Sequence, residues 1–420
     1  MAKYIINNNG PLIGAVSVSG AKNAVLPLMA ASILSDKKST IRGVPRLRDV
    51  DVMVKILRSL GGDIEFADKD TLTLDMLHVD SQEADYDLIS QMRASFLIMG
   101  PLLGRKGYAK VYMPGGCAIG LRPIDLHLKG FEALGAKVTR RKDYVEAKVG
   151  EDGLHGATIY LDFPSVGATE NIMMAAVMAK GTTYIQNVAE EPEIIDLANF
   201  LNKMGARIKG AGTDNIKIEG VSEMKSANHE VIPDRIEAGT FMLAAAITRG
   251  DVLVKNVLID HLKPLVAKLR ECGVTVEQIG DGIRVKADKG KLISTNIKTL
   301  PYPGFPTDLQ SPFMAFLTTV PGKGLVTETV FENRFMHVEE LKKMGAKISI
   351  NGNKASLTGG SKLVGTSVRA TDLRAGAAMV LAGLVAEGET EISDIYHIQR
   401  GYDALIDKLK ILGADIKISE

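Results

Sequence analysis

The amino-acid sequence predicts an α/β protein built from six similar units. A helix end that runs through glycine into a strand occurs six times, as SLGGDIEF, ALGAKVTR, KMGARIKG, ECGVTVEQ, KMGAKISI and ILGADIKI. The copies follow one another at intervals of about 70 residues, as repeated supersecondary units do. Upstream of each copy lies a second helix of small apolar residues. Helices and strands that alternate along the whole chain favour an α/β fold over a helical solenoid or a β-sandwich.

One glycine in each copy marks the end of a helix. These marker glycines are Gly61, Gly135, Gly205, Gly273, Gly345 and Gly413. A helix often ends at a residue in the left-handed conformation, which glycine adopts without a steric penalty. Apolar and polar residues alternate after the glycine, as they do in a half-buried strand. We therefore expect a helix, a marker glycine and a strand in every unit.

The second helix of each unit is expected to be buried. Its six copies are GAKNAVLPLMAASIL, RASFLIMGPLLG, GATENIMMAAVMAKG, RIEAGTFMLAAAITRG, TDLQSPFMAFLTTVPG and TDLRAGAAMVLAGLVAEG. These helices are apolar on all sides, which indicates burial. Short strands are expected after them, in TTYIQNV, DVLVKNV, GLVTETV and TEISDIY. The segment HEVIPDR (229–235) interrupts the pattern with proline and charge between the third and fourth copies, so two domains of three units are predicted.

Composition narrows the possible partners. The chain has 420 residues, and 24% of them are charged with a net charge of +1. No overall field is available to hold a nucleic acid or an anionic membrane, so neither partner is expected. The opening MAKYIINNNGPLIG lacks signal-peptide features, and no apolar run is long enough to span a membrane. Two cysteines in different contexts suggest no disulfide framework, which fits a cytoplasmic location.

Two common classes of enzyme are not indicated. The chain contains no GxxxxGK[ST] phosphate loop and no GxGxxG after a strand, which argues against ordinary nucleotide hydrolases and Rossmann dehydrogenases. Its seven histidines show no metal-ligand spacing. No metal and no cofactor are therefore expected.

A reactive thiol is predicted in MPGGCAIGLRPIDLHLKG (113–130). Cys117 lies between Gly116 and Gly120, which disfavour a continuous helix or strand, and five residues before Arg122. A nearby guanidinium group favours the thiolate, which can attack an electrophilic carbon. The other cysteine, Cys272, lies in the apolar-flanked LRECGVTV and is expected to be buried.

Charged or polar residues recur where the helices begin. The small-residue helices begin at Lys22, Arg93, Gly167, Arg235, Asp308 and Arg374, and a second set before the other helices comprises Arg48, Arg122, Arg334 and Arg400. Helix N-termini carry a partial positive charge and bind anions. Although a single charged helix start is commonplace, the joint pattern predicts a site for an anionic substrate.

Seven segments carry a resemblance to a known family. They are SGAKNA (19–24), PGGCAIGLRPIDLH (114–127), SVGATEN (165–171), FPTDLQ (305–310), FENRF (331–335), ATDLRA (370–375) and YHIQRGY (396–402). In their order and along nearly the whole chain, they resemble the UDP-N-acetylglucosamine enolpyruvyl transferase family.

The resemblance implies an inside-out α/β barrel of two domains, each made of three βαβαββ repeats. Residues 21–230 would form one domain, and residues 1–20 with 231–420 the other, with the active site in a cleft between them. The implied enzyme transfers the enolpyruvyl group of phosphoenolpyruvate to the 3-hydroxyl of UDP-N-acetylglucosamine and releases phosphate, through a tetrahedral intermediate. This reaction is the first committed step of peptidoglycan synthesis. The two substrates are the implied partners, and a monomer is expected.

The resemblance also implies roles for individual residues. Cys117 would act as the acid, form an adduct with phosphoenolpyruvate and be alkylated by fosfomycin, while Asp308 would act as the base or, alternatively, cap a helix. Phosphoenolpyruvate would be bound by Lys22, Asn23, Arg122, Arg400 and Cys117, with Lys22 also counted as catalytic. UDP-N-acetylglucosamine would be bound by Asn23, Arg93, Pro123, Asp125, Leu126, His127, Ser165, Val166, Gly167, Asp308 and Val330. Arg334, Asp372 and Arg374 would line the cleft, where they form salt bridges or take part in closure.

One segment of the chain departs from the family pattern, and two alternative functions are considered. Some family members have a lysine before the Ser-Val-Gly segment, where this chain has Phe163 and Pro164, so the diphosphate would depend more on backbone amides and arginines. A 5-enolpyruvylshikimate-3-phosphate synthase would share the fold but lack the cysteine loop. A non-catalytic clamp of six repeats around a polymer would also explain the repeats, although a net charge of +1 does not favour it.

The two cysteines are predicted to differ in reactivity. Brief treatment with iodoacetamide should label Cys117 rapidly and leave Cys272 unlabelled, because only an accessible, activated thiol reacts quickly. Mass spectrometry of the tryptic peptides measures both rates, and equal rates would contradict the assignment.

Overall fold

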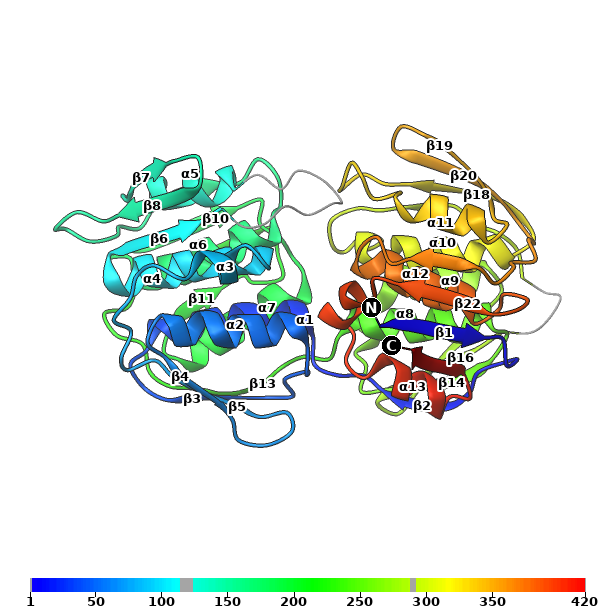
Figure 1. Cartoon of the computed structure of the whole chain (residues 1–420). Helices are drawn as coiled ribbons and strands as arrows, with labels where there is room; N and C mark the ends of the chain where they lie inside the picture. Colours follow the sequence, from blue (N-terminus) through cyan, green and yellow to red (C-terminus); the bar gives the residue numbers. More distant parts are fainter. Residues whose placement is uncertain (1, 114–123, 288–291, 420) are drawn as a thin grey trace. The chain divides into compact units, whose positions relative to one another are not determined.

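The computed structural model describes residues 2–113, 124–287 and 292–419, which form two compact units. The N-terminal unit comprises residues 20–113 and 124–232, and the C-terminal unit comprises residues 2–19 and 233–419 (Figure 1). Each unit has its own cluster of buried apolar side chains. Both units therefore have the separate core that defines a domain. In the described ranges, no helix is long and apolar enough to cross a membrane.

The N-terminal unit contains three small sheets. Their strands are β3 (Ser39–Arg42), β4 (Asp63–Phe66), β5 (Leu72–Asp75) and β13 (Asn228–Glu230); β6 (Tyr108–Tyr112), β7 (Lys137–Arg140) and β8 (Tyr144–Lys148); and β9 (Thr158–Tyr160), β10 (Thr182–Gln186), β11 (Arg207–Lys209) and β12 (Asn215–Glu219). In the first and third sheets, one edge strand pairs in parallel and the other pairs are antiparallel. In the second sheet, a parallel bridge from Glu83 to Lys110 takes the place of that edge strand.

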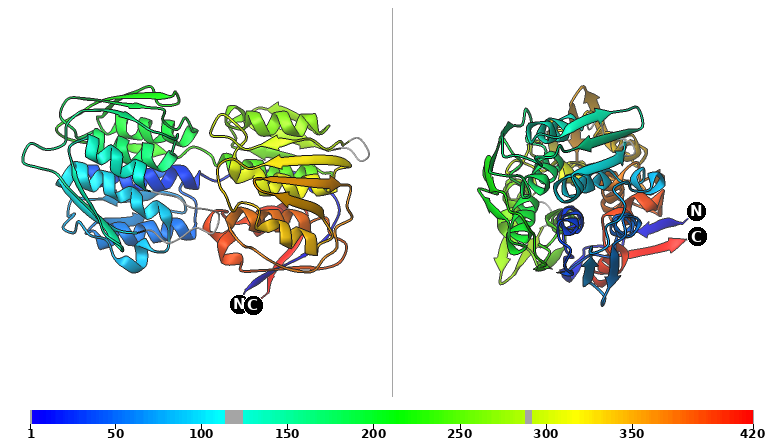
Figure 2. Two further views of the ribbon diagram at one scale, coloured as in Figure 1. Left: turned by 90° about the horizontal axis from the view of Figure 1, so that it is seen from above. Right: turned by 90° about the vertical axis from the view of Figure 1, so that its left-hand side faces the viewer.

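The C-terminal unit repeats this plan three times. Its strands are β2 (Ile13–Ser17), β14 (Asp251–Lys255), β15 (Thr275–Ile279) and β16 (Gly282–Lys286); β17 (Ile297–Lys298), β18 (Gly322–Thr327), β19 (Lys347–Asn351) and β20 (Lys354–Gly359); and β1 (Lys3–Asn7), β21 (Ser367–Arg369), β22 (Thr390–Ser393) and β23 (Asp415–Ser419). Strand β1 pairs with β22 and β23, so the two chain ends lie side by side (Figure 2). Two of the three sheets are thus completed by the first 17 residues.

The helices divide into an inner and an outer set. The inner helices are α1 (Lys22–Ala31), α4 (Met99–Lys106), α6 (Val166–Ala176), α8 (Arg235–Ile247), α10 (Gln310–Thr319) and α12 (Leu373–Gly383). The outer helices are α2 (Arg48–Ser59), α5 (Asp125–Ala133), α7 (Pro192–Lys203), α9 (Lys263–Glu271), α11 (His337–Lys343) and α13 (Leu405–Ile411). Shorter elements are α3 (Tyr86–Ile89) and the 3₁₀ helices η1 (Ser32–Leu34), η2 (Arg93–Ile98), η3 (Ile259–Leu262), η4 (Thr307–Leu309) and η5 (Ile395–Arg400).

The marker glycines behave as predicted. All six have φ between 87° and 103° and directly follow the residue that caps an outer helix. The strand of each unit then begins two residues later, at Asp63 after Gly61 and at Lys137 after Gly135, for example. The repeated helix–glycine–strand pattern and the α/β fold class are therefore confirmed.

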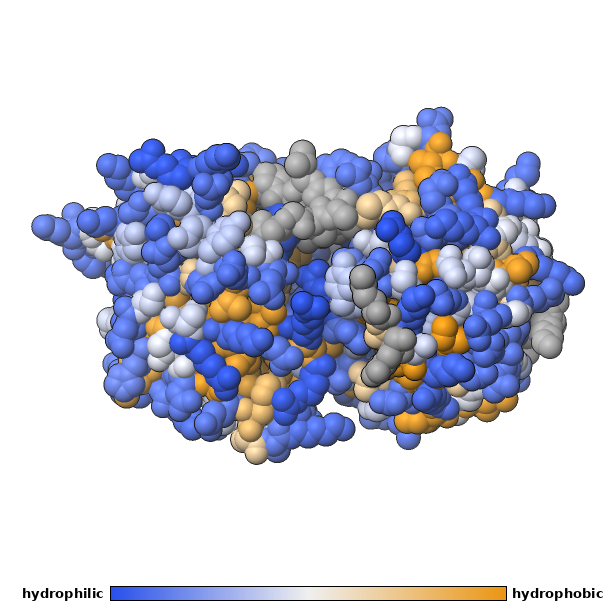
Figure 3. Space-filling view, in the orientation of Figure 1, coloured by the Kyte–Doolittle hydropathy of each residue, from blue (hydrophilic) through white to orange (hydrophobic). Residues whose placement is uncertain are grey.

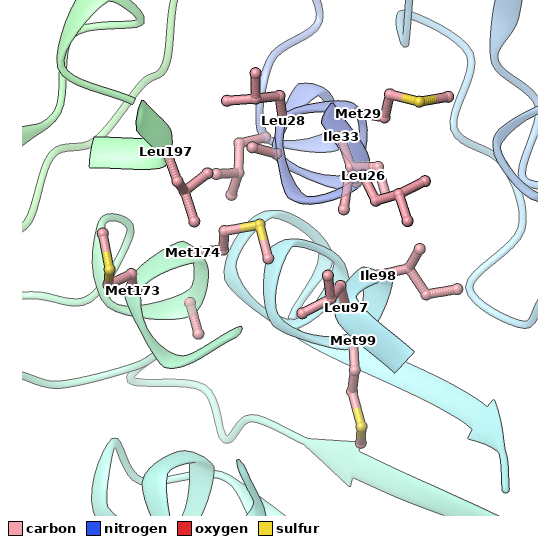
Figure 4. Packing of buried hydrophobic residues seen from close by; sticks show 14 of the residues in the cluster. Leu26, Leu28, Met29, Ile33, Leu97, Ile98, Met99, Met173, Met174 and Leu197 are labelled. Atoms are coloured by element: carbon pink, nitrogen blue, oxygen red, sulfur yellow. The ribbon is translucent and has the colours of Figure 1, made fainter. Parts of the chain in front are cut away.

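Apolar side chains of the inner helices fill much of the interior of each unit. Twelve residues of α8, from Ile236 to Ile247, are buried, and the other inner helices are buried along most of their length. In Figure 4, Leu28 of α1, Leu97 of η2 and Leu197 of α7 lie around Met174 of α6. Polar residues cover most of the face seen in Figure 3, where apolar residues form scattered patches. Each unit is thus organised around helices that have no polar side.

Two helix starts differ from the prediction. Arg93 begins the 3₁₀ helix η2, and the α-helix α4 begins at Met99, while Asp308 lies in η4 before α10. Each of these two helices has a proline at its third position, Pro101 in α4 and Pro312 in α10. Proline lacks the N–H that would bond to the carbonyl four residues earlier, so it favours the first turn of a helix, where that N–H has no intrahelical partner.

The separate cores predict separate responses to core mutations. Phe131 and Phe316 are each fully buried, one in each unit. Truncating either to alanine should lower the free energy of unfolding of its own unit by about 3–5 kcal/mol, because a cavity replaces the ring. Hydrogen exchange measured by mass spectrometry should show lost protection in that unit alone, whereas Tyr184→Ala, at a side chain that is 46% exposed, should change little. Equal loss of protection in both units would contradict two independent cores.

Candidate active site

The predicted site residues fall in both units. Three of them, Cys117, Arg122 and Pro123, lie outside the described residues. The remaining ones lie at the starts of α1, α5 and α6 and in η2 of the N-terminal unit, and at or near the starts of α10 and α12, between β18 and α11 and in η5 of the C-terminal unit. Each group is built by its own unit.

Asp308 is the centre of the group in the C-terminal unit. Its Oδ1 accepts a hydrogen bond of 2.8 Å from Arg334 Nη2, and its Oδ2 accepts bonds of 3.1 and 2.9 Å from Arg374 Nε and Nη2. The two arginine side chains are 2% and 4% exposed, whereas Asp308 is 26% exposed. One partly accessible carboxylate therefore holds two buried positive charges.

Aromatic rings support these arginines. Arg374 lies 5.4 Å from the centre of the Tyr402 ring, and Arg334 lies 5.5 Å from that of Phe331. Burial by itself disfavours the charge of Arg374, but Asp308, Tyr402 and Asp234 outweigh it, so the pKa of the guanidinium is raised. Burial also raises the pKa of Tyr402, whose hydroxyl lies 2.9 Å from Thr240 Oγ1. Arg374 is thus held permanently charged beside Asp308.

Asp372 has a local structural role at the start of α12. Its Oδ1 accepts hydrogen bonds from the backbone N–H of Arg374, at 2.8 Å, and of Ala375, at 3.1 Å. An aspartate at this position satisfies N–H groups that a helix leaves open at its start. The predicted cleft residue Asp372 therefore fixes the backbone from which Arg374 extends.

A buried glutamate organises the segment around Val330. Glu328 is 2% exposed and accepts hydrogen bonds from the hydroxyls of Thr299 and Thr307, at 2.8 and 3.0 Å. It also accepts a bond of 2.8 Å from the N–H of Val330. Since Thr307 directly precedes Asp308, one carboxylate ties both predicted ligand-binding positions to the β17–β18 edge.

Arg400 closes the 3₁₀ helix η5 and is half-buried. Burial and the charge of Arg400 lower the pKa of the neighbouring His397, which also stacks on Tyr396 with ring centres 4.1 Å apart. A histidine in these surroundings is neutral at physiological pH. The positive charge of this segment therefore comes from Arg400.

In the N-terminal unit, Lys22 and Asn23 begin the inner helix α1 and are half-buried. Lys22 Nζ lies 3.4 Å from Oδ2 of Asp49, which is buried near the start of α2. The ion pair links an inner helix to an outer helix at their N-termini. It orients the ammonium group where the resemblance implies an anionic ligand.

The predicted sugar-nucleotide residues of α5 have different environments. Asp125, the first residue of α5, is exposed and pairs with Arg140 at 2.7 Å. Leu126 packs partly against the core. His127 is half-buried, and burial together with the charge of Arg93 lowers its pKa to about 3. His127 is therefore neutral over the physiological pH range.

The start of α6 lies against His127. Ser165 caps this helix by accepting a hydrogen bond of 3.4 Å from the N–H of Ala168. A Cβ atom added at Gly167 would lie 3.4 Å from His127 Cε1 and 3.6 Å from Nε2, so the histidine edge faces the first turn of α6. Val166, which lies between Ser165 and Gly167 in the sequence, is half-buried. The structure thus brings together Ser165, Gly167 and His127.

The sequence did not identify several residues that hold these groups in place. They are Asp49, Asn171, Glu328, Tyr402 and Thr240. Asn171 follows Gly167 by four residues on a helix and therefore shares its face, which was a usable signal. Asp49 and the Tyr402–Thr240 pair meet residues distant in sequence, and Glu328 joins the distant Thr299 to the nearby Val330.

In the described ranges, no cluster of three histidine, cysteine or acidic side chains is arranged to hold a metal ion. Cys272 is fully buried, and burial raises the pKa of its thiol to about 12. The expectation of an inert Cys272 is consistent with this environment.

Comparison with known proteins places the whole chain in one group of enzymes. Residues 6–409 match the family described as EPSP synthase (3-phosphoshikimate 1-carboxyvinyltransferase). UDP-N-acetylglucosamine 1-carboxyvinyltransferase 1 of Caldanaerobacter subterraneus subsp. tengcongensis is 58% identical over 414 residues, or 99% of each chain. UDP-N-acetylglucosamine 1-carboxyvinyltransferase of Finegoldia magna is 56% identical, over 97% of this chain and 96% of that protein.

Two solved structures share the fold. The enolpyruvyl transferase NikO from Streptomyces tendae superimposes with a TM-score of 0.90 at 25% identity, covering 100% of this chain and 99% of that chain. EPSP synthase from Acinetobacter baumannii gives a TM-score of 0.76 at 19% identity over all of both chains. The second comparison shows a common fold alone.

Removing the charge of Asp308 should show how much this carboxylate contributes to the stability of the fold. In Asp308→Asn, two buried guanidinium groups lose their negative partner, which should lower the free energy of unfolding by about 3 kcal/mol. The matched control is Asp251→Asn, which removes a pair with Arg284 whose side chains are 29% and 46% exposed, and should cost about 1 kcal/mol or less. Urea denaturation measures both changes. If both variants lost the same free energy of unfolding, Asp308 would not be needed to balance the charges of the two buried arginines.

Proposed function

Because this chain belongs to the UDP-N-acetylglucosamine 1-carboxyvinyltransferase family of enolpyruvyl transferases, we propose that it catalyses the reaction for which its relatives are named. It transfers the enolpyruvyl group of phosphoenolpyruvate to the 3-hydroxyl of UDP-N-acetylglucosamine and releases phosphate. The reaction commits the sugar nucleotide to peptidoglycan synthesis, on which cell-wall formation, cell shape and cell division depend. Identity of 58% across 99% of both chains carries this conclusion.

The chemistry sets three requirements. Addition forms a bond between the sugar oxygen and C2 of phosphoenolpyruvate, while C3 gains a proton and the hydroxyl loses one. The tetrahedral intermediate then loses a proton from C3 and expels phosphate. An acid, a base and firm binding of the carboxylate and phosphate are therefore needed.

Cationic residues meet the third requirement in the proposal. Lys22, Arg122 and Arg400 bind the carboxylate and phosphate of phosphoenolpyruvate, because guanidinium groups contact both anions through paired hydrogen bonds. Asn23, next to Lys22 at the start of α1, adds an uncharged contact to the same ligand and to the sugar. The Lys22–Asp49 ion pair supports this role by orienting the ammonium group before substrate arrives.

Cys117 supplies the proton for C3 in this proposal. Its thiol also adds reversibly to phosphoenolpyruvate, and the same sulfur is the atom that fosfomycin alkylates in the family. The glycine-rich sequence around Cys117 lets the backbone approach a ligand closely.

Asp308 accepts the proton of the sugar hydroxyl. Its ion pairs with Arg334 and Arg374 aim the carboxylate and leave it 26% exposed, while both arginines are almost fully covered. In this proposal, its hydrogen bond to the hydroxyl orients the attack before proton transfer. Asp372 contributes indirectly because it fixes the backbone of Arg374.

Most of the proposed contacts of the sugar nucleotide come from the N-terminal unit, and Asp308 and Val330 come from the C-terminal unit. Besides Asn23 and Asp308, the proposed contacts are Arg93, Pro123, Asp125, Leu126, His127, Ser165, Val166, Gly167 and Val330. The start of α6 suits the diphosphate, because helix N-termini present N–H groups and a partial positive charge. The lysine found before this segment in some members is replaced by Phe163 and Pro164, so backbone amides carry more of the contact here.

No metal or cofactor takes part in the proposed steps, since the acid, base and cations all come from side chains. We further propose that the enzyme is a monomer. We also propose that it works in the cytoplasm, where both substrates are made.

A phosphate-release assay tests the function. Phosphate should appear only when UDP-N-acetylglucosamine and phosphoenolpyruvate are both present. Release with shikimate 3-phosphate would move the assignment to the alternative synthase of the same fold. Salt-sensitive DNA binding without turnover would instead favour a polymer clamp.

The cysteine is tested by paired substitutions. Cys117→Ser should lower kcat about 100-fold or more, because it removes the general acid. Cys117→Asp should retain turnover through its carboxyl group and resist fosfomycin, whereas the control Cys272→Ala should keep both turnover and inhibition. Full activity of Cys117→Ser would remove this thiol from the reaction.

A further inference from the structure

The side chain of Asn171 joins three parts of the N-terminal unit. It is fully buried on α6, and all of its polar atoms are used. Oδ1 accepts a hydrogen bond of 2.6 Å from the N–H of Gly100, while Nδ2 donates to the carbonyl of Phe96 at 3.0 Å. Nδ2 also lies 3.1 Å from Nδ1 of His127. The carboxamide therefore connects η2, α4 and α5.

The first two bonds replace a missing helical bond. In an uninterrupted α-helix, the N–H of Gly100 would donate directly to the carbonyl of Phe96. Here the carboxamide stands between them, at the junction of η2 and α4. Gly100 is required for this approach, since a Cβ atom there would lie 2.4 Å from Asn171 Oδ1. Insertion of a side chain into the ladder is a known cause of a helix break.

These bonds fix the orientation of the amide. A backbone N–H can only donate and a backbone carbonyl can only accept, so Oδ1 must face Gly100 and Nδ2 must face Phe96. The atom of Asn171 that meets His127 is therefore the donor Nδ2. Reversing the amide would break both backbone contacts.

The histidine tautomer follows from that orientation. An imidazole nitrogen that accepts a hydrogen bond carries no proton, so Nδ1 of His127 is bare and the ring proton lies on Nε2. The edge with Cε1 and Nε2 faces Gly167 in the first turn of α6. His127 consequently presents an N–H donor at that turn.

The charged surroundings keep His127 neutral. Among the described residues, Arg93 of η2 is the charged group that acts on the ring, and with burial it lowers the pKa to about 3. Asp125, on the same helix as His127, is paired with Arg140. From α6, the ring meets Asn171 and Gly167, which carry no charge, and the Phe96 ring packs edge-on with centres 5.2 Å apart.

We propose that Asn171 is a positioning residue that locks His127 in the Nε2–H tautomer, so that His127 donates a hydrogen bond to a phosphate oxygen of the sugar nucleotide at the start of α6. The choice of ligand rests on the proposed function, whereas the choice of tautomer does not. A neutral His127 recognises the diphosphate through a hydrogen bond and not through a charge. The strength of this contact therefore does not change between pH 5.5 and 8. A purely structural Asn171 would bridge η2 and α4 without affecting the ring.

The tautomer is measured directly in the unmodified chain. With ring-¹⁵N-labelled histidine, two-bond ¹H–¹⁵N correlation distinguishes a protonated Nε2 from a bare Nδ1, and the spectrum of His127→Gln identifies the signals. We expect a neutral Nε2–H ring that does not titrate from pH 8 to 5.5. A ring protonated on Nδ1, or one that titrates in this range, would overturn the proposal even if the protein is fully active.

Asn171→Asp tests the link to binding. A carboxylate at this position favours a proton on Nδ1 and raises the pKa of His127. At pH 8 the neutral ring then turns a bare Nε2 toward the diphosphate, and KM for UDP-N-acetylglucosamine should rise about tenfold, as the loss of a charge-assisted hydrogen bond predicts. As the pH falls to 6, the imidazolium regains the Nε2 proton and KM should recover, while the wild-type KM stays flat.

Asn202→Asp is the matched control. The Asn202 amide also bridges a backbone N–H and a carbonyl, both of Ile208, at 2.8 and 3.0 Å, with no histidine involved. Its KM should show the wild-type pH profile. A folded Asn171→Asp variant with that same flat profile would refute the positioning role.

Two further variants apply if Asn171→Asp does not fold. In His127→Gln the side-chain amide can supply an N–H near the position of Nε2, so most of the affinity for UDP-N-acetylglucosamine should remain, whereas His127→Leu should lose about tenfold. Equal affinities of the two variants would exclude the donor role. If neither variant nor wild type binds the sugar nucleotide, the proposed function fails, while the tautomer measurement still decides the role of Asn171.

Discussion

The structure depends on the burial of helices that have no polar side. In each unit, three inner helices of small apolar residues fill the core. Their sides are closed to water, so the polar side chains there, such as Asn171 of α6, bond within the core, and groups that meet a ligand lie at the helix ends. Lys22 begins α1, Ser165 caps α6, and Asp372 caps α12, with Asp308 one turn before α10. The candidate site is thus placed at helix starts because the rest of each inner helix is needed for the core.

Both units use ion pairs at their polar groups, and the N-terminal unit adds a network of neutral hydrogen bonds. In the C-terminal unit, charge balance dominates, since Asp308 holds two buried guanidinium groups and the Tyr402 and Phe331 rings lie beside them. In the N-terminal unit, neutral hydrogen bonds fix His127 through Asn171. Ion pairs suit residues that must stay charged near an anionic substrate, whereas neutral bonds suit a donor whose proton must stay on one nitrogen.

The fold by itself does not specify the substrate. A synthase that is 19% identical shares it with a TM-score of 0.76, and folds commonly serve several reactions. In the proposed function, the substrate is decided by the residues at the helix starts and by Cys117. Identity of 58% over 99% of both chains, far above the 19% of the synthase, supports an activity as well as a fold.

The sequence by itself determined the local and periodic features. The marker glycines, the strands that begin two residues after them, and the six buried helices all follow from patterns within a few residues. The types of residue at the helix starts were also readable, and the resemblance supplied their expected roles. The short 3₁₀ segments before α4 and α10 were missed, because the effect of proline on the preceding turn was not weighed against the apolar pattern.

Only the tertiary structure decided which side chains meet. Asp308 contacts Arg374 across 66 positions of sequence, and His127 contacts Asn171 across 44. Strands β1 and β2 complete sheets formed mostly by residues more than 200 positions away. Periodicity shows which face of an element is buried, but it does not show which other element covers that face. The partner is chosen by packing and by the need of every buried charge or amide for a complementary group.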